Sequence, residues 1–106
     1  PGTFSSMEYK LRGGPLLYQS HADRLSRVTT IKYYIPEWNR QVSRSSLVTL
    51  KVFDVLGREV ATLVNEWQSP GYKSVPFEVT GLSSGVYLYA LRDGNSIRAR
   101  KLVVFK

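Results

Sequence analysis

Residues 83–94 read SSGVYLYALRDG, and this stretch carries the clearest fold signal in the sequence. A small polar turn leads into residues 86–92, VYLYALR, where successive side chains point to opposite faces of a β-strand. The Asp-Gly pair at residues 93–94 marks a tight hairpin turn, and residues 96–105, SIRARKLVVF, supply the returning strand. The stretch therefore predicts a β-hairpin near the C-terminus.

The strand at residues 86–92 is largely apolar on both faces, which indicates a central strand or one partly covered by a neighbouring domain. Tyr87 directly follows the turn, where its hydroxyl can bond upstream backbone in a tyrosine corner. We expect Tyr87, Tyr89 and Leu91 to face the core, with hydroxyl partners for the two tyrosines. The alternative is an aromatic platform for a sugar or a peptide.

Upstream, β-branched and aromatic residues recur in short runs separated by turn residues. The predicted strands are residues 28–35, 47–55, 58–64 and 72–79, in addition to 86–92 and 96–105. Pro76 cannot donate a ladder hydrogen bond, so the strand at 72–79 is expected at a sheet edge. This pattern predicts an all-β fold, an immunoglobulin-like antiparallel β-sandwich of about seven strands.

The same alternation predicts the core and the domain limits. Residues 1–15 contain a Gly-Gly-Pro break and are expected to be a linker or leader from an upstream domain, with the sandwich at 16–106. The sequence starts at Pro1, and we interpret it as a piece of a longer protein with any targeting segment upstream. The predicted core residues are Ile31, Tyr33, Val48, Leu50, Val52, Val60, Leu63, Val75, Phe77, Tyr87, Tyr89 and Leu91.

Composition argues against catalysis. The 106 residues contain no cysteine and one histidine, His21, which removes thiolate metal sites, histidine metal clusters and Cys/His nucleophiles. The eight acidic residues form no convincing catalytic pair, and Asp54 and Glu59 flank a turn, where capping or a cross-hairpin contact is expected. We expect no enzyme activity, no cofactor and no metal.

The net charge of +7 permits an anionic partner. However, the basic residues are spread along the chain, apart from a group near the C-terminus, whereas a nucleic-acid binder usually gathers them on one face. We therefore expect no nucleic acid as partner. No apolar run approaches the roughly 20 residues of a membrane-spanning helix, so we expect no transmembrane segment.

Four segments together resemble a known family. They are TTIKYYIP (29–36), VTLKVFDVLGREVATLVNE (48–66), SPGYKSVPFEVTGLSSGVYLYAL (69–91) and RARKLVVFK (98–106). Over about residues 16–106 the sequence resembles the type A C-terminal sorting domain of the type IX secretion system, the Por secretion C-terminal domain. That domain is similar in layout to the immunoglobulin-like domain of the flagellar hook-capping protein.

The resemblance implies a non-catalytic C-terminal sorting or anchoring domain that directs a larger secreted protein through type IX export. The implied partners are an upstream cargo domain of the same chain and an outer-membrane translocon or a sortase-like peptidase. The implied localisation is the periplasm in transit, then the cell surface or the medium. The residues implied in translocon recognition are Gly85, Val86, Tyr87, Arg98, Arg100, Lys101, Leu102, Val103, Val104, Phe105 and Lys106.

One stretch departs from the family pattern. Members often carry Tyr-Pro-Asn-Pro-Phe-Asn-Pro before the first Thr-Thr-Ile strand, whereas residues 21–27 read HADRLSR here. The prolines pre-set an extended backbone. Their absence makes the conformation of the strand at 28–35 the feature to check.

Two groups of residues keep two readings. Arg98 and Arg100 alternate onto one face while Lys101 breaks the alternation, which suggests a bulge. This group is either a solvated face that discourages edge aggregation or a docking patch for a translocon component or an anionic lipopolysaccharide. Trp38 and Trp67 lie beside turns and are either half-buried plugs or a sugar-stacking pair. The latter reading would make the domain an accessory carbohydrate-binding module, and an inert spacer module is a further alternative.

Overall fold

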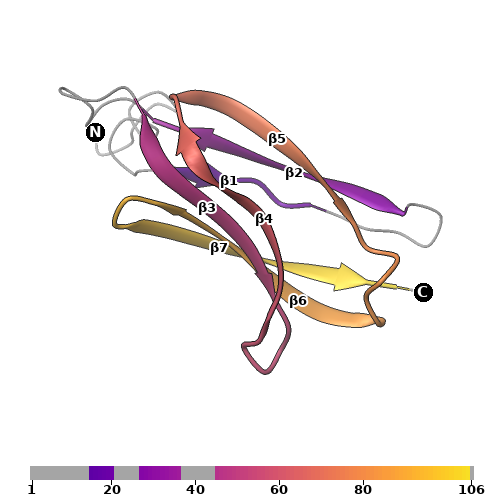
Figure 1. The fold of residues 1–106 in the computed structure, drawn as a ribbon. Coiled ribbons are helices and arrows are strands. Elements are labelled where there is room, and N and C mark those ends of the chain that lie inside the picture. Colours follow the sequence, from indigo (N-terminus) through magenta and orange to yellow (C-terminus); the bar gives the residue numbers. More distant parts are fainter. Residues whose placement is uncertain (1–14, 21–26, 37–44, 106) are drawn as a thin grey trace, which may run out of the picture.

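The computed structural model describes residues 15–20, 27–36 and 45–105. Two antiparallel sheets, one of three strands and one of four, confirm the predicted all-β sandwich of seven strands. The strand order is β1-β2-β5 in the first sheet and β4-β3-β6-β7 in the second. Figure 1 shows β2 and β5 together in one layer and the β6–β7 hairpin in the other. The strands are β1 (Leu16–Leu17), β2 (Val28–Ile35), β3 (Ser46–Phe53), β4 (Glu59–Gln68), β5 (Gly71–Glu78), β6 (Gly85–Asp93) and β7 (Ser96–Val104).

The core lies between the two sheets and is filled by alternate side chains of each strand. Most of the predicted core is confirmed, and Leu63 and Val75 are partly buried against it. The N-terminal segment and the last strand add core residues that the prediction omitted. The buried apolar residues are Leu17, Ile31, Tyr33, Ile35, Val48, Leu50, Val52, Val64, Phe77, Val79, Tyr87, Tyr89, Leu91, Leu102 and Val104.

Val60 is a wrong core prediction, because its side chain is 39% exposed. The register between β3 and β4 shifts twice, and the pairings there pass over Leu63 and Val60. Each bulge changes the inward and outward assignment of the residues that follow it. Strict alternation therefore fails along β4, and Val64 is the residue that reaches the core.

β2 forms over the predicted residues without the prolines that the family often places before it. The Arg27 carbonyl accepts a hydrogen bond from the Val79 backbone N–H at 2.9 Å. β2 then pairs with β5 over its whole length, from Val28 to Ile35. Cross-strand pairing holds this strand extended. His21 and residues 1–14 of the predicted leader lie outside the described residues, whereas Pro15 is described and buried.

β5 is an edge strand, as Pro76 predicted. Pro76 pairs with Thr30 of β2 and, lacking an N–H, fits a position whose nitrogen points away from the partner strand. At the start of β6, the Tyr87 hydroxyl donates to the Ser83 carbonyl at 2.7 Å. This bond confirms the predicted tyrosine corner.

Candidate functional site

The candidate site is β7, which lies at the edge of the four-stranded sheet. β6 is the only strand that pairs with it in a ladder within the described ranges 15–20, 27–36 and 45–105. The register between β6 and β7 runs without interruption from Asp93–Ser96 to Gly85–Val104. The bulge expected at Lys101 is therefore wrong, because Lys101 simply pairs with Leu88.

The hairpin turn decides which backbone groups of β7 point away from β6. Gly94 has a φ of 62° and no non-glycine described residue has a positive φ, a combination that fits a two-residue type II′ turn. Asp93 and Ser96 then exchange both ladder bonds, and such pairs recur at every second position. The N–H and C=O groups of Ile97, Ala99, Lys101 and Val103 therefore point outward; we call them the outer edge.

Part of the outer edge is covered by residues 15–20, which we call the strap. The Gln19 side-chain amide donates to the Lys101 carbonyl at 2.6 Å, and this acceptor lies on the outer edge, as the turn geometry requires. Arg100 Nε donates to the Leu17 carbonyl at 3.0 Å from the other side. The strap thus bonds β7 at Arg100 and Lys101, and no hydrogen bond joins the described residues 15–20 to Leu102, Val103 or Val104.

Tyr89 fastens the strap to the sandwich. Its hydroxyl donates to the Tyr18 carbonyl at 2.7 Å and accepts from the Ser20 backbone N–H at 2.8 Å. The Ser20 hydroxyl also bonds the Thr29 hydroxyl, 2.5 Å away. Burial raises the pKa of Tyr89 above its ordinary value, so its phenol stays neutral and able to donate. No sequence periodicity signals these contacts, which join residues about 70 positions apart.

The predicted recognition residues at the end of the chain divide into two groups. Leu102 and Val104 are fully buried and belong to the core. Val103 and Phe105 are exposed, by 37% and 60% of their surface. Lys106 lies outside the described residues. Side chains that a partner can touch therefore alternate with side chains that hold the sandwich together.

The start of β6 lies beside this end of β7. Gly85 pairs with Val104, and Val86 pairs with Val103. Val86 and Leu88 are 39% and 45% exposed on the outer face of β6, although β6 is a central strand. We call Val86, Leu88 and Val103 the outer patch. The apolar second face noted in the sequence is thus open to solvent here.

The basic residues of β7 are separated in space. Arg98 and Arg100 alternate with the outward residues and lie on the same side of β7 as Leu102 and Val104. Arg100 donates a hydrogen bond to the Leu17 carbonyl of the strap. Lys101 lies on the opposite side of β7 and is exposed beside Leu88 on the outer face. Of these three cations, Lys101 is the one adjacent to the outer patch.

The remaining predicted residues have structural surroundings. Asp54 accepts hydrogen bonds from the Leu56 and Arg58 backbone N–H groups and from Arg58 Nε, and these bonds lower the pKa of its carboxyl. Glu59 pairs with Lys51 across the β3–β4 hairpin at 3.3 Å. The predicted turn-capping and cross-hairpin roles are confirmed.

Trp67 is 67% exposed on β4, so the half-buried plug predicted for it is wrong. Trp38 lies outside the described residues. In the part of the chain that the structure describes, no group of three or more histidine, cysteine or acidic residues is placed to hold a metal ion. That part also contains no helix with the length and apolar character to cross a bilayer.

Comparison with known proteins identifies the family of the chain. The profile of the family described as the secretion system C-terminal sorting domain matches residues 29–105, well over half of the chain. The match runs from the second residue of β2 to one residue beyond β7. A search of curated proteins found no match. The chain therefore belongs to the family of type IX secretion C-terminal sorting domains, whose members are signals for export through the periplasm to the cell surface or medium.

Proposed function

We propose that this domain directs a larger secreted protein through type IX export by presenting the end of β7 and the outer patch to an outer-membrane translocon component. A sorting domain acts on the chain that carries it, so its partners are a cargo on the same chain and the type IX machinery. The observation that carries the proposal is the position of β7 at a sheet edge.

Strand addition is the mechanism that this geometry supports. An exposed edge strand offers unpaired N–H and C=O groups that an extended segment of a partner can match. At Val103 these groups point outward, two residues past the Lys101 carbonyl that the strap bonds. Each backbone hydrogen bond contributes about 0.5–1.5 kcal/mol net, so a few of them need additional side-chain contacts to give useful affinity.

The outer patch supplies such contacts. Val86, Leu88 and Val103 are exposed apolar side chains on two adjacent strands, with Lys101 at their border. Burying an apolar side chain contributes about 25 cal/mol per Å² of surface removed from water. Apolar contacts would provide affinity, while the backbone pairing and Lys101 would fix register and orientation. A sortase-like peptidase is the second partner that could bind the same surface, the end of β7 with the outer patch.

The buried residues of β7 explain how a signal can be both folded and readable. Leu102 and Val104 anchor the strand in the core, so the handle keeps its shape whatever cargo precedes it. The same anchoring complicates the simplest test. Deleting residues 102–106 from a fused reporter should abolish export, but this deletion also opens the core.

A shorter deletion separates recognition from folding. Removing residues 105–106 takes away the exposed Phe105 and the residue after it but leaves all of β7. We expect export of the reporter to fall while the melting temperature of the isolated domain changes by no more than about 3 °C. Normal export after deletion of 102–106 would refute the proposal, whereas normal export after deletion of 105–106 would exclude only Phe105 and Lys106 from recognition.

A further inference from the structure

A second surface lies on the outer face of the other sheet, β1-β2-β5. Alternation places Lys32 of β2 and Tyr72 and Ser74 of β5 on the outer face of the three-stranded sheet. Tyr18 of the strap joins them, because its backbone N–H donates to the Lys32 carbonyl at 3.0 Å. These residues, with Lys73 at the rim, line an open hollow of about 390 Å³, within the usual size range of ligand pockets.

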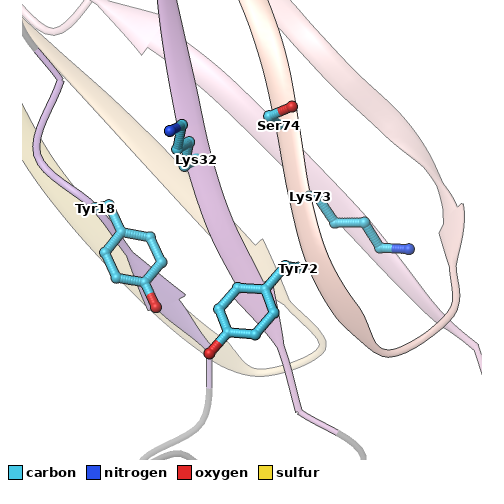
Figure 2. Close-up of a pocket in the computed structure, with 5 residues that line it drawn as sticks. All are labelled: Tyr18, Lys32, Tyr72, Lys73 and Ser74. Atoms are coloured by element: carbon cyan, nitrogen blue, oxygen red, sulfur yellow. The ribbon is translucent and has the colours of Figure 1, made fainter.

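Two phenol rings flank this hollow. Figure 2 shows the rings of Tyr18 and Tyr72 with their hydroxyls turned toward one another, and Lys32 above them on β2. The Tyr72 ring is held by a tilted contact with Tyr34, with ring centroids 4.7 Å apart. Tyr72 is nevertheless 63% exposed. A tyrosine offers a flat apolar face and a polar rim at low entropy cost, which suits a ligand with both characters.

Lys32 gives the hollow its charge. Its side chain is exposed, and no carboxylate in the described part of the chain forms an ion pair with it. Lys73 extends to the other side of β5 in Figure 2, and its ammonium lies 3.4 Å from the Ser69 hydroxyl. The hollow therefore presents one cation near two aromatic rings, with Ser74 at the position paired with Lys32 on the neighbouring strand.

We propose that this hollow binds an acidic pyranose unit of a polysaccharide. The C–H face of the sugar ring would lie against Tyr18 and Tyr72, and the sugar carboxylate would pair with Lys32. The hydroxyls of Ser74 and the two tyrosines would bond sugar hydroxyls. A single-stranded nucleic acid is disfavoured, because it needs a basic groove that follows several phosphates, whereas Glu78 carries an acid on this strand face.

This site differs from the sugar-stacking pair that the sequence suggested. Trp67 lies on the four-stranded sheet, and the described residues place no second aromatic platform around it. The inference does not rest on sorting, and it is tested on the 106-residue chain alone.

The test is a calorimetric or NMR titration with trigalacturonate and with a neutral oligosaccharide of similar length. An exposed site with one ion pair should bind trigalacturonate with a Kd of about 0.1–1 mM. Tyr72→Ala should weaken binding about tenfold, while Tyr72→Phe retains most of it. Lys32→Gln should remove the preference for the acidic sugar and its sensitivity to salt.

Matched controls are Arg92→Gln, which removes an exposed cation from β6, and Trp67→Ala on β4, both on the other sheet. Both should bind as the parent chain does, and thermal melts establish that every variant is folded. The proposal is overturned if no binding is detected at about 10 mM trigalacturonate, ten times the upper end of the expected Kd. It is also overturned by equal affinity for the neutral sugar, by unchanged binding in Tyr72→Ala, or by tighter binding of a single-stranded oligonucleotide.

Discussion

Replacing Tyr89 by phenylalanine tests how the strap is attached. The ring and its packing stay, but the hydroxyl that bonds both Tyr18 and Ser20 is lost. The Ser20 backbone N–H is then left without its acceptor in a residue that is 5% exposed. An unsatisfied buried donor costs about 1–3 kcal/mol, and the half-exposed Tyr18 carbonyl adds less because water can reach it. We expect Tyr89→Phe to lower the free energy of unfolding by about 2–3 kcal/mol.

Tyr87→Phe is the matched comparison. It removes one hydroxyl bond, to the exposed Ser83 carbonyl, and should cost about 1 kcal/mol. In a thermal melt, Tyr89→Phe should lower the melting temperature by about 10–20 °C and Tyr87→Phe by about 4–8 °C.

Hydrogen exchange gives a local readout of the same prediction. The Ser20 amide should be protected in the parent chain and should exchange about ten to a hundred times faster in Tyr89→Phe. The reasoning is refuted if Tyr89→Phe costs no more than Tyr87→Phe, or if exchange at Ser20 is unchanged.

Two further predictions concern the turn and the alkaline range. Gly94→Ala should destabilise the domain by about 1 kcal/mol, because the φ of 62° at Gly94 disfavours a side chain. Gly81→Ala is the control and should change stability by no more than about 0.5 kcal/mol. Equal chemical-denaturation midpoints for the two variants would contradict the prediction. Burial raises the pKa of Tyr33 and Tyr89 above the ordinary value of 10.0, so the unfolded chain ionises first. The stability that these two phenols contribute should therefore be constant below about pH 9 and be lost as pH rises above about 10. Tyr89→Phe should flatten that fall in urea titrations at several pH values, and an unchanged slope would argue against the burial effect.

The sequence predicted the features that depend on neighbouring residues. Alternation located β2, β5, β6 and β7 to within one or two residues, because each strand packs one face on the core. Asp93 and Gly94 predicted the hairpin, and Pro76 predicted the edge position of β5. The tyrosine corner also followed from local order, because Tyr87 and its acceptor Ser83 are four residues apart.

Features that depend on distant contacts were missed. Val60 was misplaced because bulges break the alternation, and a bulge is decided by the partner strand rather than by local composition. The strap could not be predicted, because the amide of Gln19 reaches the Lys101 carbonyl across 82 positions. For the site, the sequence indicated the last strand as a whole. It did not separate Leu102, which is buried in the core, from Val103, which is exposed to a partner.

The central claim is that the outer edge of β7 pairs with a partner through its backbone. Val103→Pro tests this claim most directly, because the backbone N–H of Val103 points away from β6 in the parent chain. Proline lacks this N–H, so the substitution removes one outer-edge donor while the ladder between β6 and β7 remains. Val103→Ala keeps the backbone donor. Ser74→Pro makes the equivalent change on the edge strand β5, two residues from the tolerated Pro76.

The measurement is the fraction of a fused reporter that reaches the cell surface or medium, with a melting temperature for each variant. We predict that Val103→Pro blocks export although the domain stays folded. Val103→Ala, which loses only part of one outer-patch side chain, should still be exported, and Ser74→Pro should be exported at the parent level. Export of a folded Val103→Pro fusion at the parent level would contradict backbone pairing at this edge.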